Sequence, residues 1–215
     1  MYPLNFIDRT NVRMVMPSYD ERLDRLLTTA ARVFADKGYH PTTMRDLARE
    51  TGMSLAGMYH YVEGKDELLF LIQQRCFTRV LSGAETAMAP GTDPRQRLER
   101  FIRHHVIFFT GHMSEMKVLS HEAKSLLGER LDTINALKRR YVALLTDLVQ
   151  SADGAHESAI DPHVASYALF GMMNWIYNWY DPTGPVSPEA LSEQFSRLFL
   201  SGLTTDFHTQ VLPGG

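Results

Sequence analysis

The sequence predicts an all-α protein in which a small helix-turn-helix region precedes a larger helical domain. Two observations carry this prediction. Apolar residues recur every three or four positions along most of the chain, and no stretch keeps the alternation typical of a β-strand. Glycine and proline clusters at Ala89–Pro94 and Asp181–Pro185 interrupt that pattern. We therefore expect an arm (residues 1–18), a helix-turn-helix domain (19–66), a larger helical domain (67–206) and a tail (207–215).

The first helices are defined by their end signals. One helix is expected over Asp20–Lys37, where Gly38 ends it, and a short one over Thr43–Thr51, with Gly52 as the stop. A third is expected over Ser54–Tyr61. A long helix should run from Lys65 to about Met88.

Apolar positions mark the later helices. Spaced apolar and histidine residues from Leu98 to His112 mark one face of a helix. A shorter helix is expected near Glu115–Leu126, and a long helix is expected over Leu131–Leu148. The helix Pro162–Tyr180 is apolar nearly all round, so it should be covered on every side. The last helix should begin at Pro188, with Ser187 as its cap, and end near Thr204.

Composition places the chain among folded cytoplasmic proteins. The hydrophobic fraction of 44% is that of a chain with a packed core. The lone Cys76 fits a reducing compartment, where it would act as a small buried hydrophobe. Met1–Ser18 lacks the pattern of a signal peptide, and Val164–Tyr180 is too short and interrupted to cross a bilayer. We expect no membrane partner.

Charge is distributed unevenly. The chain carries a formal net charge of −3. Residues 1–80 hold 11 Lys and Arg against 10 Asp and Glu, and the remainder holds 11 against 15, which gives +1 and −4. This asymmetry permits nucleic-acid binding by the first part without demonstrating it.

The segment Thr42–Leu69 has the mechanics of a helix-turn-helix. Thr43 and Asp46 have capping-box spacing, and Gly52 permits a tight turn with positive φ. Ser54 can cap the next helix. The small residues that follow it would let the backbone of that helix approach base edges in the major groove.

This segment resembles the TetR family of transcription repressors. The ordered pattern Thr-Thr, Asp-Leu-Ala, Gly-Met-Ser, Met-Tyr-His-Tyr and Gly-Lys-Asp-Glu-Leu carries the resemblance, which covers residues 20–70 closely. Val62 stands where the family usually has Phe. The resemblance implies a DNA-binding set, in which Leu55, Ala56 and Gly57 lie nearest the bases, Ser54 opens the reading helix, and the phosphate contacts are Thr43, Tyr59, His60 and Lys65. The alternative is an ordinary helical hairpin, with Tyr59 in the core and Lys65 solvated.

The second half resembles the TetR subgroup that senses acyl-coenzyme A thioesters, on the stretches Phe170–Ser187 and Leu200-Ser-Gly-Leu. A Met- and aromatic-rich set also suits an adaptable apolar pocket, and a buried amide such as Asn174 needs a partner. The candidate ligand-binding residues are Phe108, Phe109, Met113, Met116, Phe170, Met173, Asn174, Trp175 and Tyr177. Plain core packing, or a different hydrophobic ligand or drug, are the alternatives.

We expect an acyl-CoA-like effector, in particular a long-chain one, and no cofactor. Its phosphates would need cations. Nothing local selects among those available, and Lys138–Arg140 is interpreted as a solvated face. The available cations are Arg100, Arg103, Lys117, Lys124, Lys138, Arg139 and Arg140.

A helical metal-dependent oxidase is the enzyme alternative. It would need carboxylate and histidine pairs at ligand spacing, and the sequence contains neither HExxH nor a matched pair of Glu-x-x-His motifs. We therefore expect no metal site and no enzyme activity. A pure interaction module is a third alternative, and it would show no salt-dependent DNA binding.

The last two helices are the expected dimer interface. Residues spaced by three and four on the last helix suit packing against a partner, and the preceding helix is too apolar to be left exposed. A four-helix bundle with two helices from each chain is the symmetric solution. The interface candidates are Gly171, Trp179, Phe195, Leu198, Phe199 and Gly202. The expected function is a homodimeric repressor of a pseudo-palindromic operator that a small apolar effector releases.

Overall fold

The computed structural model describes residues 18–88, 93–122, 124–153 and 160–203. The predicted tail, and all of the predicted arm except Ser18, lie outside these residues. Every regular element in the described ranges is helical, as predicted. The elements are α1 (Tyr19–Lys37), α2 (Met44–Thr51), α3 (Leu55–Tyr59), α4 (Lys65–Ala87), α5 (Pro94–Gly111), α6 (Met113–His121), α7 (Gly128–Asp153), α8 (Pro162–Asn174), a 3₁₀ turn η1 (Ile176–Asn178) and α9 (Pro188–Leu203).

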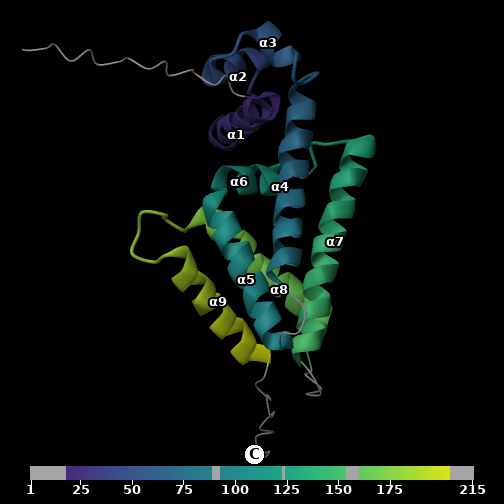
Figure 1. Cartoon of the computed structure of the whole chain (residues 1–215), viewed down its shortest axis with the longest axis vertical. Helices are drawn as coiled ribbons and strands as arrows, with labels where there is room; N and C mark the ends of the chain where they lie inside the picture. The colour runs from purple at the N-terminus through teal and green to yellow at the C-terminus, as the bar shows by residue number, and fades with distance from the viewer. Residues whose placement is uncertain (1–17, 89–92, 123, 154–159, 204–215) are drawn as a thin grey trace, which may run out of the picture.

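The first three helices form a small head (residues 18–64) at one end of the molecule (Figure 1). α1 begins with a capping box between Ser18 and Glu21. Its inner face packs against α2, α3 and the first turns of α4 around one apolar cluster. Arg32 of α1 pairs with Glu50 of α2, with 3.3 Å between the charged atoms. The head is therefore held both by its core and by this link between helices.

The remaining helices form the body (residues 65–203), and α4 connects it to the head (Figure 1). Leu68 and Ile72 of α4 belong to the cluster beneath the head, whereas Val80 and Ala84 belong to the body core. A Cβ at Gly83 would overlap the ring of His104 on α5, so glycine allows the two helices to approach closely. One rigid helix thus contributes to both cores.

The segment after Pro162 differs from its prediction. α8 ends at Asn174, and the chain tightens into η1, where Trp179 and Tyr180 both donate backbone hydrogen bonds to the carbonyl of Ile176. The Tyr180 hydroxyl then donates to the carbonyl of Val186 at 2.8 Å and closes the turn towards α9. The predicted continuous helix to Tyr180 is wrong because these tighter contacts replace its last turn.

One face of α8 is uncovered within the chain. Val164, Tyr167 and Trp175 are exposed by 63%, 59% and 60%, and Gly171 lies between them on the same helical face. The expectation that this helix is covered on every side therefore does not hold for a single chain. In the described part of the chain, no helix combines the length and apolar character that crossing a membrane requires.

Candidate DNA-binding surface and effector pocket

The turn that presents α3 is built by short-range contacts. Thr43 caps α2 in a capping box with Asp46, and the Thr43 hydroxyl donates to the Asp46 carboxylate at 2.6 Å. Hydrogen bonds from Thr43, and secondarily from Arg49, lower the pKa of Asp46 to about 2. Gly52 follows in the left-handed region, with φ 68°. The hydroxyl of Thr43, a predicted phosphate ligand, is thus already engaged in the cap.

α3 places the predicted base-reading residues at the far end of the head (Figure 1). The Ser54 hydroxyl accepts a hydrogen bond from the Gly57 amide at 3.0 Å and fixes the first turn. Met58 is fully buried and anchors the helix. The outward set has Ser54, Ala56, Tyr59 and His60 exposed, with Leu55 and Gly57 half-buried. The core position of the alternative interpretation does not apply to Tyr59, which is 51% exposed.

Lys65, the remaining predicted phosphate ligand, lies at the start of α4. Its Nζ donates to the carbonyl of Tyr39 at 2.9 Å and to that of His40 at 3.1 Å, and it lies 4.4 Å from the centre of the Tyr39 ring. Tyr39 also donates to the Asp66 carboxylate. Lys65 therefore ties the loop between α1 and α2 to α4, and one N–H of its ammonium remains for a phosphate.

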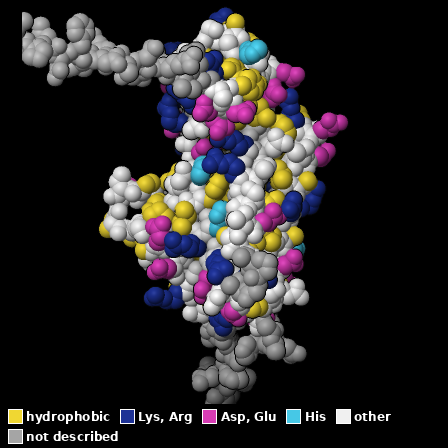
Figure 2. Space-filling view, viewed as in Figure 1, with side chains coloured by type: hydrophobic (Ala, Val, Ile, Leu, Met, Phe, Trp, Pro, Cys, Tyr) yellow, Lys and Arg dark blue, Asp and Glu magenta, His cyan; other side chains and the backbone are white. Residues whose placement is uncertain are grey.

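Sequence reasoning missed three arginines of the head. Arg22 and Arg25 line a groove of about 610 Å³ together with Ser54, Gly57 and other residues of α1–α3. Arg45 is exposed on the first turn of α2. Lys and Arg side chains are mixed with Asp and Glu over this part of the surface (Figure 2). These cations escaped attention because the motif concerns α2 and α3, whereas the groove includes α1.

The body contains an apolar cavity of about 390 Å³. Five helices, α4 to α8, supply its wall. Its rim includes the exposed Ser120 and Tyr167 and the half-buried Lys138. The lining residues are Phe77, Val80, His105, Phe109, Met116, Leu119, Ser120, Lys138, Tyr141, Val142, Tyr167, Phe170 and Asn174.

Some of the predicted ligand-binding residues line this cavity, and the others lie elsewhere in the body. Phe109, Met116, Phe170 and Asn174 line it. Asn174 is exposed, so the expectation of a buried amide at this position is wrong. Phe108 lies in two other hollows, and the fully buried Met173 and the half-buried Met113 belong to the body core. Trp175 is exposed, and Tyr177 packs beside the cluster of Cys76, Met116 and Leu119.

Among the polar or charged cavity residues outside the predicted ligand set, three have shifted pKa values. His105 is fully buried, and its Nδ1 lies 3.0 Å from the Tyr141 hydroxyl. Burial, and then the charge of the neighbouring His104, lower the pKa of His105 to about 3, whereas a hydrogen-bonding interaction with the Asn174 side chain raises it. Burial also raises the pKa of Tyr141, so both groups are neutral near pH 7. Burial lowers the pKa of Lys138, whose Nζ lies 5.6 Å from the centre of the Phe77 ring, so Lys138 is not simply solvated.

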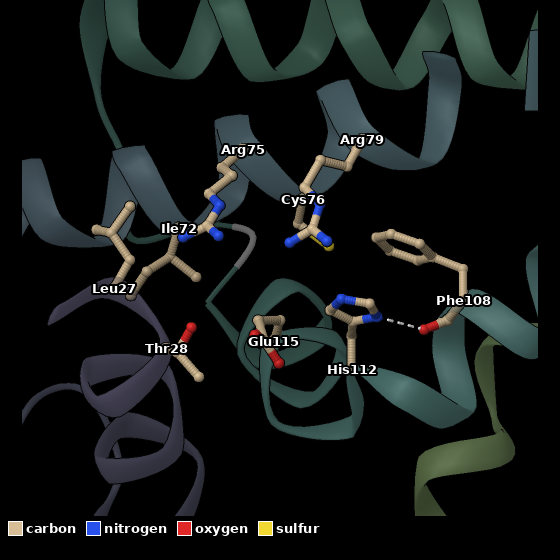
Figure 3. A pocket seen from close by; sticks show the side chains of 9 residues that line it. All are labelled: Leu27, Thr28, Ile72, Arg75, Cys76, Arg79, Phe108, His112 and Glu115. Atoms are coloured by element: carbon tan, nitrogen blue, oxygen red, sulfur yellow. Dashed lines mark hydrogen bonds between the residues drawn. The ribbon is translucent and has the colours of Figure 1, made fainter. Parts of the chain in front are cut away.

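A small hollow of about 20 Å³ marks the junction between head and body (Figure 3). The Arg75 guanidinium on α4 pairs with the Asp24 carboxylate on α1, with 2.6 Å between the charged atoms. Burial, followed by the charge of Glu115, raises the pKa of Cys76. The side chains around the hollow come from α1, α4, α5 and α6, including His112 at the α5–α6 break: Leu27, Thr28, Ile72, Arg75, Cys76, Arg79, Phe108, His112 and Glu115.

No cluster of three or more His, Cys, Asp or Glu side chains that could hold a metal ion occurs among the described residues. The geometry instead combines an exposed short helix on a capped turn of the head with a partly open apolar cavity in the body. That combination defines a helical DNA-binding regulator with a ligand domain.

Comparisons with known proteins identify the class. A family model described as "Tetracyclin repressor-like, C-terminal domain" matches residues 91–203, more than half of the chain, and one described as "Bacterial regulatory proteins, tetR family" matches residues 26–72. The chain belongs to the TetR family of transcription regulators, which are not enzymes.

Individual relatives cover most of the chain. The HTH-type transcriptional repressor KstR2 of Mycolicibacterium smegmatis is 25% identical over 187 residues, which are 85% of this chain and 91% of the relative. The solved structure of AibR in complex with isovaleryl coenzyme A and operator DNA is 30% identical, with a TM-score of 0.72 and coverage of 85% and 97%. The TetR-family regulator PfmR from Thermus thermophilus is 30% identical, with a TM-score of 0.76 and coverage of 85% and 100%.

Proposed function

We propose that this chain is a homodimeric transcription repressor that leaves its operator when the cavity of the body binds a compact acyl group carried on coenzyme A. The single observation behind this proposal is the apolar cavity of about 390 Å³ within a TetR-family body. Cavities that hold small organic ligands range from about 300 to 1,000 Å³, so this volume is at the small end. It favours a short, branched or cyclic acyl group over the long chain that the sequence suggested.

Two relatives support the proposal that this chain binds operator DNA and an acyl-CoA. AibR was solved with isovaleryl coenzyme A, a short branched acyl thioester, and with operator DNA. KstR2 of Mycolicibacterium smegmatis is named a transcriptional repressor. In this chain Ala56 and Gly57 of α3 would approach the base edges of the major groove, and the exposed Tyr59 and His60 at the end of that helix would contact phosphates. Arg22, Arg25 and Arg45 would add phosphate contacts at the sides.

Exposed apolar residues on α8 and α9 support a dimer. Tyr167 and Gly171 of α8, Trp175 just after it and Leu198 of α9, which is 67% exposed, are apolar or small and lie outside the chain's own core. Gly202 of α9 and Trp179 after α8 are exposed as well. Phe195 is buried in the chain's own core, and Phe199 is half-buried against it. The proposed interface therefore uses the exposed residues and leaves the two phenylalanines in their own chain.

The coenzyme A head would lie at the rim of the cavity. Its phosphates cannot enter an apolar cavity without cations to pair with them, because burial of an unpaired charge is costly. Lys138 is the one lysine or arginine among the described lining residues. We therefore assign it to the head group.

Coupling to DNA would pass through α6. Met116, Leu119 and Ser120 of α6 line the cavity, and the same helix packs against α1 of the head. Gln73 of α4 is buried and donates to the carbonyl of Glu122, just after α6, at 3.2 Å. A ligand that moves α6 would therefore tilt the head and change the spacing of the two α3 helices, which must match successive major grooves about 34–36 Å apart.

Calorimetry with a series of acyl-CoA thioesters tests the effector. We expect affinity to rise by up to about 0.8 kcal/mol per added CH₂ and to fall once the acyl group exceeds the cavity. Release of a fluorescent operator should follow the same order. Equal weak binding by all members would contradict the effector class and leave the DNA-binding proposal intact.

The substitution Lys138→Gln tests whether Lys138 binds the coenzyme A head group or the acyl group. It should weaken acyl-CoA binding while leaving the affinity for the matching N-acetylcysteamine thioester, which carries no phosphate, within about twofold. Lys124→Gln, at an exposed residue outside the cavity, is the matched control and should change neither. An equal loss for both thioesters would contradict the assignment of Lys138 to the head group.

A further inference from the structure

The cavity wall contains a buried histidine nitrogen that no well-formed hydrogen bond satisfies. His105 is fully buried, and its Nε2 meets no partner at hydrogen-bond geometry among the described residues. The Asn174 side chain on the same cavity wall interacts with His105 and raises its pKa, but it does not complete a hydrogen bond to Nε2. An unpaired polar atom in an apolar environment is unfavourable, because it has lost water without replacing it. His105 lines the cavity, so a group bound there can reach this atom.

Tyr141 determines which ring nitrogen carries the proton. Its hydroxyl contacts His105 Nδ1 at 3.0 Å. If Nδ1 carried the proton, it would donate to the hydroxyl oxygen, and the buried O–H of Tyr141 would have no acceptor among the described residues. If the hydroxyl donates to Nδ1, both groups are satisfied and the proton lies on Nε2. The pair therefore presents an N–H donor to the cavity.

The ring is held in place as well as polarised. Phe109 stacks on His105, with 3.7 Å between the ring centres, and Phe170 lies on another side, with 5.7 Å between the centres. A donor fixed by packing loses little freedom on binding, so it can discriminate between ligands that present or lack an acceptor.

We propose that His105 selects the effector by donating a hydrogen bond from Nε2 to a carbonyl oxygen, with Tyr141 as the positioning residue that fixes the tautomer. The inference rests on the cavity of the proposed function and adds the chemistry that this cavity recognises. The carbonyl is either that of the thioester or a ketone within the acyl group. Both present the same acceptor, and the ligands of the test distinguish them.

The test measures preference for a carbonyl in matched ligand pairs. One pair is an acyl-CoA and the S-alkyl-CoA thioether of equal length, which lacks the carbonyl oxygen. The other pair is a cyclic ketone small enough for the cavity and its hydrocarbon, neither attached to coenzyme A. We expect the wild-type protein to prefer the carbonyl member of at least one pair by about tenfold. The pair that shows this preference identifies the carbonyl.

Variants at position 105 connect the preference to the histidine. His105→Leu should reduce it to about onefold, whereas His105→Gln, which retains an N–H donor of similar reach, should keep most of it. Val142→Ala is the matched control on the cavity wall and should weaken both members of a pair equally. A preference that survives in His105→Leu would overturn the inference.

The tautomer gives a readout that needs no ligand and no substitution of His105. Long-range ¹H–¹⁵N spectra of the wild-type protein should show the proton on Nε2, and Tyr141→Phe should change the populations of the two tautomers. A proton found on Nδ1 in the wild type would overturn the inference.

The outcomes also separate this inference from the proposed function. If the ketone pair discriminates but no thioester binds, the histidine inference stands and the acyl-CoA effector fails. If thioester and thioether bind equally well and the ketone has no advantage, the effector class stands and the inference fails. If no ligand of either pair binds, both fail.

Discussion

The head and the body differ in how far apart in the sequence the contacting residues of their functional sites lie. In the head, the cap of α3 involves Ser54 and Gly57, and the cap of α2 involves Thr43 and Asp46, so each contact spans three residues. In the body, the His105–Tyr141 contact spans 36 residues, and the cavity takes side chains from five helices. The helix caps of the head can therefore be inferred from spacing alone, whereas the cavity of the body depends on how distant helices pack.

The largest effect is expected from a substitution that disrupts the proposed dimer interface of the body. Leu198→Glu would place an unpaired charge in the α8–α9 interface, which we expect to raise the dimer dissociation constant by about a thousandfold, or about 4 kcal/mol. Operator binding should then be almost lost, because two α3 helices can no longer bind together. Light scattering and a fluorescence titration with operator DNA measure the two effects.

The matched control is the same substitution at another exposed leucine. Leu127 lies between α6 and α7 and is 80% exposed. Leu127→Glu should leave both dimer and operator binding unchanged. A Leu198→Glu protein of normal dimer size would show that the interface lies elsewhere.

The second effect concerns the buried histidine of the body. The pKa of His105 is about 3 in the folded chain, below the ordinary value of 6.5, so the unfolded chain binds more protons between these pH values. Stability should therefore fall as the pH drops below about 6.5, by up to about 1.4 kcal/mol per pH unit from this group. His105→Gln should remove this part of the slope in urea unfolding between pH 6.5 and 5. Parallel slopes for the two proteins would contradict the buried neutral histidine.

Particular residues show why the cavity was only partly predicted. Phe109, Met116, Phe170 and Asn174 were selected because they are aromatic, methionine or amide residues in apolar helices. His105 shared an apolar face with His112, yet sequence alone could not show that Tyr141 would meet it. The break at Asn174 was missed because the apolar pattern continues through η1, whereas the backbone hydrogen bonds to Ile176 and the bond from the Tyr180 hydroxyl to Val186 form the tighter turn.

The head offers a finer contrast between two cations. Arg45 is exposed, and no acidic side chain among the described residues pairs with it. Arg45→Ala should weaken operator binding by about tenfold and reduce the salt slope by about 1 per protomer, without changing thermal stability. Lys65→Ala should lower thermal stability, because the tether to the carbonyls of Tyr39 and His40 is lost, and it should flatten the salt slope only if its free N–H reaches a phosphate. An unchanged slope in Arg45→Ala would remove that arginine from the DNA surface.

The smallest expected effects are changes in the free energy of unfolding when one glycine from each region is replaced by alanine. Gly52 has φ 68°, where a Cβ is strained, so Gly52→Ala should destabilise the chain by about 1 kcal/mol and disturb the angle at which α3 leaves α2. Gly111, at the end of α5, has a backbone that any residue adopts and no atom within 4 Å of its Cβ position, so Gly111→Ala should stabilise the chain by about 0.5 kcal/mol. Urea unfolding gives both values, and operator titration should show a loss only for Gly52→Ala. Equal effects of the two substitutions would mean that the left-handed turn does not set the position of α3, and the local character of the head would have to be abandoned.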